Sequence, residues 1–325
     1  MSRTYKATGI NLKGMPLGEY DRLLTILTPE FGVIRAVAPG ARKHKSQFAG
    51  RSGLFVVNHL LIAQGRNLDK ITQAQTLESY PGLSANLTKL TASQYLAELV
   101  LLQALSGQPQ EELYELLSEH LRRLENAPIH TVIAHLTQAV FHLLAIAGIG
   151  PQVQLCCITQ QPLTPDFTNP NWYVGFNVLA GGTVMASAIG PRTVRKIADR
   201  LPAARPLPQA IGLRTVRKIG PRTVRKIAQR TEEEGAQESA KLEYDNQSGQ
   251  KMSSQRALHA RINATELALL QQLAAPELPK QKIVTSNIWR RLEQILRQYA
   301  EYHFDRQIRA AALIDTCFPI WSGEG

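Results

Sequence analysis

The sequence has few of the features that mark secreted, membrane-bound or disulfide-stabilised proteins. Only three of its 325 residues are cysteines, and two of them, Cys156 and Cys157, are adjacent, which excludes a disulfide framework and favours a reducing cytoplasm. The longest apolar stretch, near residues 139–150, is interrupted by His142 and is shorter than the ~20 residues of a membrane span. The N-terminus, MSRTYKATG, lacks the apolar core of a signal peptide. We therefore expect a cytoplasmic protein with no membrane partner.

Signatures of catalysis and of metal binding are also lacking. No GxxxxGK[ST], GxSxG or HExxH pattern occurs, so the common nucleotide, serine-hydrolase and zinc-protease sites are excluded. A structural zinc ion needs four soft ligands. The fourth position counted from Cys157 is Gln160, and the TVMAS sequence after Gly181 and Gly182 holds no cysteine. We expect no enzyme activity, no cofactor and no metal.

What the chain has is positive charge, and it is concentrated in one place. The formal net charge is +11, and residues 189–230, with 12 basic residues and one acidic residue, account for all of it. The same segment repeats itself as IGPRTVRKIA, IGLRTVRKI and GPRTVRKIA. We interpret residues 187–256 as one largely disordered insertion. It is either a tolerated linker or a flexible basic arm that adds non-specific affinity for nucleic acid.

The N-terminal part has the pattern of a small β-barrel. Five short apolar segments are separated by turn residues rich in glycine and proline, which predicts five strands joined by short connections. Such a set fits an OB-fold, and an SH3-like barrel fits it nearly as well. The predicted strands are residues 4–13, 21–28, 32–38, 54–64 and 68–77.

A basic loop, PGARKHKSQFAGR at residues 39–51, connects the third and fourth predicted strands. Its four cations suit the displacement of counterions from a phosphate backbone. Ser46 and Gln47 can donate to phosphate oxygens, and the face of Phe48 suits stacking on a base. The alternative is an ordinary solvated loop with Phe48 folded back onto the barrel. The cations are Arg42, Lys43, Lys45 and Arg51.

After residue 80 the apolar residues follow a helical period. Ser84 is the expected N-cap of the first helix, and a second helix, residues 111–125, starts acidic and ends basic, as the helix dipole favours. We predict an α+β protein with a barrel domain at 1–80 and a helical bundle domain at 81–325, interrupted by the insertion. The further predicted helices are residues 128–148, 263–274 and 286–303.

Several motifs together resemble one protein family. LKGMPLGEYDRLLTILTPEFG at residues 12–32, PGARKHKSQFAGR at 39–51 and the following LFVVNHLLIAQGRNLDKITQAQTLES are similar to the N-terminal domain of RecO, a family of bacterial recombination mediators. The resemblance covers about residues 1–188 and, more loosely, 256–318. It implies an OB-fold followed by a helical domain. Some members of the family carry a four-cysteine zinc module, and residues 151–188 take its place here as a degenerate version without the ligands.

The resemblance implies a DNA-binding protein of DNA repair and recombination, associated with the nucleoid. Such a protein anneals single strands and helps to load recombinase onto DNA coated with single-stranded DNA-binding protein (SSB). The implied partners are single- and double-stranded DNA, RecR and the acidic C-terminal tail of SSB. One alternative is an adaptor that docks SSB or RecR without touching DNA, and another is an RNA-binding protein of translation. The expected DNA-binding residues are Arg35, Arg42, Lys43, Lys45, Ser46, Phe48, Arg51 and Arg66.

Overall fold

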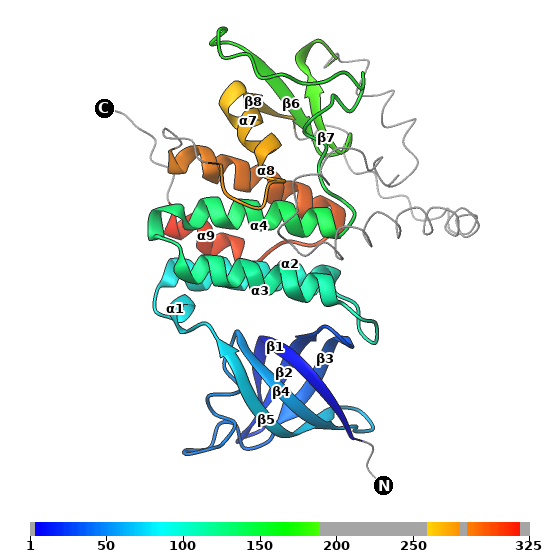
Figure 1. The fold of residues 1–325 in the computed structure, drawn as a ribbon, viewed down its shortest axis with the longest axis vertical. Coiled ribbons are helices and arrows are strands. Elements are labelled where there is room, and N and C mark those ends of the chain that lie inside the picture. Colours follow the sequence, from blue (N-terminus) through cyan, green and yellow to red (C-terminus); the bar gives the residue numbers. More distant parts are fainter. Residues whose placement is uncertain (1–3, 189–258, 280–284, 319–325) are drawn as a thin grey trace, which may run out of the picture. The chain divides into compact units, whose positions relative to one another are not determined.

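The computed structural model describes residues 4–188, 259–279 and 285–318 (Figure 1). The chain forms two compact units, one of residues 1–136 with 307–325 and the other of residues 137–306. Residue 80, where the sequence places a domain boundary, is the end of the barrel, and the first unit continues beyond it into helices. Of the insertion expected at 187–256, residues 189–256 lie outside the described part of the chain.

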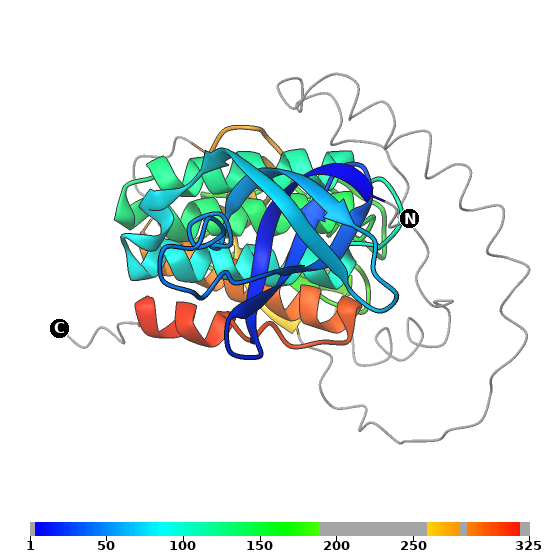
Figure 2. The same cartoon turned by 90° about the horizontal axis from the view of Figure 1, so that it is seen from below.

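The first unit begins with a closed five-stranded barrel (Figures 1 and 2). Its strand order is β1-β2-β3-β5-β4, with β1 also paired to β4 and with β3 parallel to β5. This connectivity is that of an OB-fold, which decides between the two barrels that the sequence left open. The strands are β1 (Thr4–Leu17), β2 (Asp21–Thr28), β3 (Gly32–Ala38), β4 (Val56–Ala63) and β5 (Asp69–Ser79).

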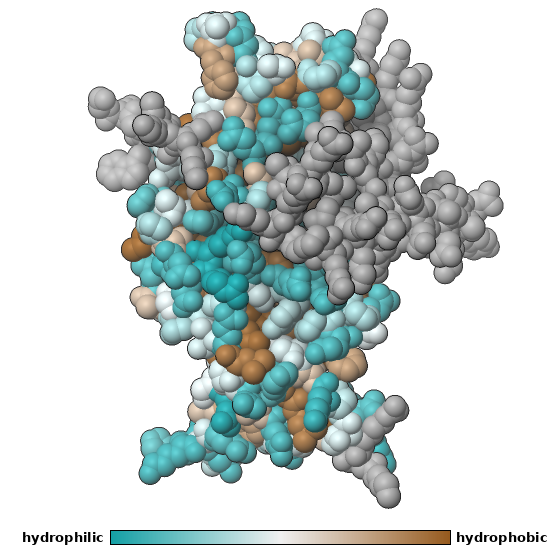
Figure 3. Space-filling model, viewed as in Figure 1, coloured by the Kyte–Doolittle hydropathy of each residue, from teal (hydrophilic) through white to brown (hydrophobic). Residues whose placement is uncertain are grey.

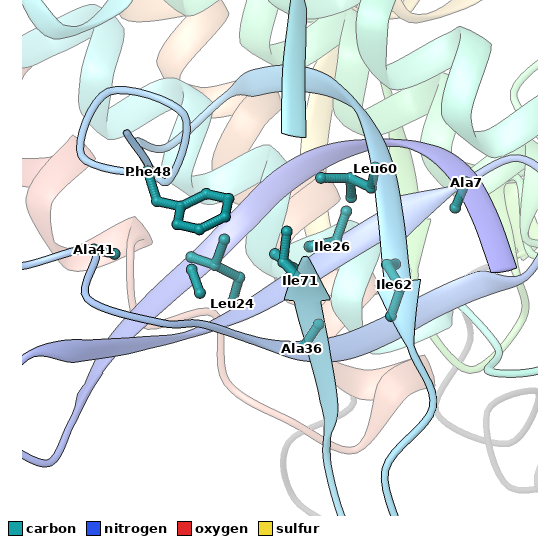
Figure 4. Close-up of a cluster of buried hydrophobic side chains, with 10 residues drawn as sticks. Ala7, Leu24, Ile26, Ala36, Ala41, Phe48, Leu60, Ile62 and Ile71 are labelled. Atoms are coloured by element: carbon teal, nitrogen blue, oxygen red, sulfur yellow. The ribbon is translucent and has the colours of Figure 1, made fainter. Parts of the chain in front are cut away.

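Alternation along the strands builds the core of the barrel, because successive side chains of a strand point to opposite faces. Leu24 and Ile26 of β2, for example, are 2% and 0% exposed and lie on the same face. Two residues of the basic loop, Ala41 and Phe48, complete this core (Figure 4). The remaining members are Ala7, Ala36, Ala38, Leu60, Ile62 and Ile71.

Four α-helices complete the described part of the first unit. Asn86 caps the second of them, accepting hydrogen bonds from the backbone N–H groups of Thr88 (3.0 Å) and Lys89 (3.2 Å). The predicted cap at Ser84 is therefore wrong, because Ser84 is the last residue of a separate short helix. The helices are α1 (Pro81–Ser84), α2 (Leu87–Gln103), α3 (Glu111–Asn126) and α9 (Ala311–Cys317).

The barrel is joined to these helices through the turn between β2 and β3. Gly32 has φ +64°, and a Cβ there would collide with the carbonyl oxygen of Leu105. Next to it, the N–H of Val33 donates to the same Leu105 oxygen (2.9 Å), and the N–H of Gly107 donates to the oxygen of Phe31 (2.9 Å). Glycine is needed at this point because the backbones approach each other so closely.

The described part of the second unit holds a small antiparallel sheet and three α-helices, of which α4 starts within the first unit. The sheet order is β7-β6-β8, so a strand from before the insertion pairs with a strand from after it. Asn263 and Glu266 form a capping box at the start of the helix that follows the sheet. The elements are α4 (Val132–Ile146), β6 (Tyr173–Asn177), β7 (Gly182–Met185), β8 (His259–Asn263), α7 (Ala264–Gln272) and α8 (Ser286–Phe304).

Among the described residues, one helical stretch is long and apolar enough to cross a membrane by its length and composition. Ile129–Ile146 covers a single 3₁₀ turn, η1 (Ile129–Thr131), together with α4, and has a mean hydropathy of 1.5. However, 67% of this stretch is buried inside the protein. A helix that is apolar on all sides and buried in this way has the property of a core helix.

Candidate nucleic-acid interface

The basic loop is anchored by the aromatic residue that the sequence assigned to base stacking. Phe48 is only 5% exposed and lies in the barrel core beside Ala41 and Leu24 (Figure 4). Burying a phenyl ring among aliphatic side chains removes a large apolar area from water, whereas an exposed ring leaves it hydrated. The expected stacking face at Phe48 is therefore not on the surface, and the prediction of its role is wrong. Phe48 holds the loop to the barrel.

Hydrogen bonds fix the start of the loop to the turn between β1 and β2. The carboxylate of Asp21 accepts from the N–H of Gly40 at 2.7 Å, and the N–H of Arg42 donates to the carbonyl oxygen of Tyr20 at 2.9 Å. Gly40 has φ +63°, a conformation that glycine adopts without a steric penalty. Asp21 thus positions the loop.

Two buried amides hold the end of the loop. The side chains of Asn11 and Asn58 are 0% and 1% exposed, and both donate to the carbonyl oxygen of Arg51, at 2.8 Å and 3.0 Å. Asn11 also donates to the oxygen of Gly53 at 2.9 Å. Buried amides of this kind are costly unless they are paired. They therefore specify one position for the loop.

Within the loop, Ser46 has a structural role. Its Oγ accepts from the N–H of Phe48 at 3.1 Å, and its own N–H donates to the oxygen of Lys43 at 3.2 Å. Lys45, between them, has φ +63°. These contacts form a tight turn that points Phe48 inward and leaves Lys43 and Lys45 exposed.

The four cations of the loop form no salt bridge with an acidic side chain in the described part of the chain. Arg42 donates to the carbonyl oxygen of Gly18 (3.2 Å), and Arg51 donates to that of Gln47 (3.0 Å). Both partners are neutral, and none of the salt bridges in the described part of the chain includes a residue of this loop. A local excess of positive charge on an ordered surface attracts polyanions.

The two outlying cations of the predicted site lie near the same pair of strands. Arg35 is exposed on β3, one residue before Ala36, and Ala36 pairs with Asp69, the first residue of β5. Arg66 is exposed in the turn that leads into β5. Among the described residues, no hydrogen bond or ion pair joins either of them to the basic loop. Arg42, Lys43, Lys45 and Arg51 therefore share one ordered loop, to which Arg35 and Arg66 do not belong.

Sequence reasoning missed two residues at the base of the loop. Tyr20, in the β1–β2 turn, is 46% exposed, and the ammonium nitrogen of Lys43 lies 4.8 Å from the centre of its ring. Arg22, the second residue of β2, donates to the backbone oxygen of Ser52 at 3.1 Å. The sequence showed only that Tyr20 lies in a turn, two residues after Gly18. Whether its side chain is exposed depends on the loop that folds beside the turn, and no local pattern reveals this.

The zinc-module-like segment is ordered around a single thiol. The Sγ of Cys156, which is buried, lies 3.5 Å from the N–H of Thr159 and 3.3 Å from the N–H of Met185 and accepts from both. The Oγ1 of Thr159 donates to the Sδ of Met185 (3.6 Å). The turn therefore starts at Cys156. If Cys156 is taken as the first cysteine of a CxxC motif, Thr159 stands where the motif has its second cysteine. Across residues 4–188, 259–279 and 285–318, no cluster of three or more His, Cys, Asp or Glu side chains suits a metal ion.

Comparisons with known proteins agree with the likeness seen in the motifs. Residues 1–80 match the family model "Recombination protein O N terminal", and residues 84–198 match "Recombination protein O C terminal". The chain is 51% identical to a protein of Nostoc sp. (strain PCC 7120) over 98% of this chain and 97% of that protein. It is 50% identical to one from Acaryochloris marina over 98% and 96% of the two chains.

A more distant relative, from Gloeobacter violaceus, is 36% identical over 97% of this chain and 94% of its own. All three relatives carry the name DNA repair protein RecO. The alignment with the Nostoc protein covers 98% of this chain, so its span includes residues 189–256.

Proposed function

The chain belongs to the RecO family of DNA repair proteins, and from that premise we propose that it is a recombination mediator that binds DNA through the basic loop of its barrel. The observation that carries this proposal is the group of four cations, Arg42, Lys43, Lys45 and Arg51, which is held in one place and forms no salt bridge with the described carboxylates. We place the protein in the cytoplasm, at the nucleoid.

The mechanism that the loop supports is the neutralisation of phosphate charge. Two single strands repel each other, so annealing requires that both backbones be screened when they meet. Cations on a preordered loop release the counterions condensed on the DNA, and this release drives binding without nucleotide hydrolysis. Phe48, Asn11 and Asn58 already hold the loop in one position. DNA binding therefore does not have to bear the entropic cost of ordering it. The proposal needs no catalytic residue.

The partners that we propose follow from the same function. Single- and double-stranded DNA would contact the loop through their phosphates, which both forms share. RecR and the acidic tail of SSB are further proposed partners, through which recombinase loading onto SSB-coated DNA would proceed.

The test replaces the three exposed loop cations together. In the variant Arg42→Ala/Lys43→Ala/Lys45→Ala, the slope of log affinity against log salt for single-stranded DNA should fall by about two units, since each phosphate contact contributes about 0.7 unit. The rate at which the protein anneals complementary oligonucleotides should fall with it. Both quantities are measured on naked DNA with the full-length protein.

A matched control removes cations elsewhere. Arg306 and Arg309 are exposed, and their replacement by alanine keeps the backbone N–H groups that bond Glu301 and Glu98. This double variant should keep the wild-type salt slope. If the triple variant also kept it, the loop would not be the DNA-binding element, and a protein that reaches DNA only through SSB or RecR would become the better account.

A further inference from the structure

The barrel has an exposed aromatic ring beside the basic loop, although it is not the one in the loop itself. Tyr20 follows Gly18 and Glu19 in the turn between β1 and β2 and is 46% exposed, whereas Phe48 is 5% exposed. Exposed rings also occur elsewhere in the described part of the chain, as at Tyr302 (52%), so exposure alone does not indicate a ligand. What distinguishes Tyr20 is its position next to the four cations of the basic loop.

The backbone of the turn that carries the ring is hydrogen-bonded to the basic loop. Gly18 has φ +58° and makes the turn possible. The oxygens of Gly18 and Tyr20 both accept hydrogen bonds from Arg42 of the loop, at 3.2 Å and 2.9 Å. A hydrogen bond to Glu19 raises the pKa of the Tyr20 phenol, so the ring stays neutral throughout the physiological range. The turn and the loop therefore form one surface.

One cation of the loop already lies against this ring. The ammonium nitrogen of Lys43 is 4.8 Å from the ring centre, within the range of a cation–π interaction. When Lys43 leaves the ring for a phosphate, the ring surface that it covered becomes available to a ligand. An aromatic face with adjacent cations is what non-specific single-strand binding requires, since every base has a π-face and every nucleotide has a phosphate.

We propose that Tyr20 is the platform on which an unpaired nucleobase stacks, with Arg42 and Lys43 holding the neighbouring phosphates. The inference rests on the proposed function and deepens it, because the cations alone attract single-stranded and double-stranded DNA alike. A base can lay its face on Tyr20 only when it is not stacked within a duplex. The aromatic turn therefore gives the site its preference for single strands.

The test compares Tyr20→Ala with Tyr20→Phe in the full-length protein, using oligo(dT) and a duplex of the same length. The affinity of Tyr20→Ala for oligo(dT) should fall about fivefold or more, the loss expected for one stacked base. Its affinity for the duplex should stay unchanged, as should the slope against log salt, because no charge is removed. Tyr20→Phe keeps the ring and should bind oligo(dT) as the wild type does.

Tyr302→Ala is the matched control, since Tyr302 is an exposed tyrosine (52%) on α8. It should change none of these affinities. A second probe, Tyr20→Trp, reports contact directly, because the fluorescence of the added indole should be quenched when oligo(dT) binds and not when the duplex binds.

The inference is overturned if Tyr20→Ala binds oligo(dT) as tightly as the wild type, or if Tyr20→Trp shows no added quenching relative to the wild type. Either result would leave the proposed function standing as long as the loop variant Arg42→Ala/Lys43→Ala/Lys45→Ala shows the expected decrease in its salt slope. Failure of the proposed function is seen separately, as an unchanged salt slope in that loop variant.

Discussion

Two irregular segments are ordered in the same way but differ in charge. They are the basic loop at residues 39–51 and the zinc-module-like turn at residues 156–161. Each is an irregular segment held by one buried side chain, Phe48 in the first and Cys156 in the second. Each adds hydrogen bonds to that anchor. The loop carries four cations within 13 residues, whereas Asp166 is the only charged side chain in the whole of residues 151–188. On the face drawn in Figure 3, the surface of the barrel is a mixture of hydrophilic and hydrophobic residues.

The difference teaches that an ordered turn is not by itself evidence of a ligand. In the second turn, the Sγ of Cys156 accepts two backbone N–H groups, so the thiol has a structural use without a metal. A sulfur acceptor of this kind satisfies donors that would otherwise be buried without partners. Function is to be sought where order and uncompensated charge coincide.

The largest expected effect comes from removing the anchor of the basic loop. Phe48→Ala should lower the free energy of unfolding by about 3–5 kcal/mol, the usual cost of truncating a buried phenylalanine. The loop should lose its fixed position, so the affinity for single-stranded DNA should fall as well. Urea denaturation followed by circular dichroism measures the first effect, and oligo(dT) binding measures the second.

The control is Phe48→Leu, which keeps most of the buried volume and should cost far less stability. It should also keep the wild-type affinity for DNA. If Phe48→Ala were as stable as the wild type and only its DNA binding fell, Phe48 would be an exposed stacking residue after all. Phe48 would then not be a buried anchor like Cys156, and the comparison of the two segments would fail.

The barrel was largely predictable from the sequence, and the small sheet was not. The predicted bounds of β2 and β3 agree with the structure, because alternating apolar residues between turn signals define both ends. The strands of the second sheet are only four or five residues long, too short to show a period. β8 also follows β7 by more than 70 residues, and no local pattern reveals a pairing at that separation.

The candidate site was predictable in its charge and not in its geometry. The four cations of the loop are visible as a cluster in the sequence. The direction in which Phe48 points depends on contacts with β2 and β5, which are distant along the chain. The exposure of Tyr20 depends in turn on where the loop lies. Asn11 and Asn58 were missed because a polar residue in a strand gives no sign that its amide will hold a loop.

A smaller effect is expected in the second turn. Cys156→Ala leaves the N–H groups of Thr159 and Met185 without their acceptor, which should cost about 1–3 kcal/mol of stability. The affinity for single-stranded DNA and its salt slope should not change, because this segment presents no cation. The combination of lost stability and kept binding is the reverse of that for the loop variant Arg42→Ala/Lys43→Ala/Lys45→Ala.

Cys156→Ser tests whether the acceptor or the bulk of the thiol matters. The hydroxyl is smaller but can accept the same two hydrogen bonds, so Cys156→Ser should be more stable than Cys156→Ala. Weaker DNA binding in either variant, at a temperature where both are folded, would show that the second turn contributes to the interface and would end the comparison as drawn.

The smallest effect is expected from acid, on the free energy of unfolding. Variants of the two segments should respond to acid alike, because the titrating group lies in a helix outside both. Burial, together with the nearby charge of Arg123, lowers the pKa of His135 on α4 to about 4, against an ordinary value near 6.5. Between these values the unfolded chain binds a proton that the folded chain does not, so stability is complete above about pH 6.5 and declines toward pH 4.

The decline due to His135 should amount to about 1–2 kcal/mol, since its side chain is only partly buried and solvent screens part of the effect. Urea denaturation between pH 6.5 and 4 measures it. Wild type, the triple loop variant and Cys156→Ala should lose the same amount over this range, whereas His135→Leu should lose less because it has no proton to take up. A larger acid loss in either segment variant than in the wild type would place an acid-sensitive group within that segment.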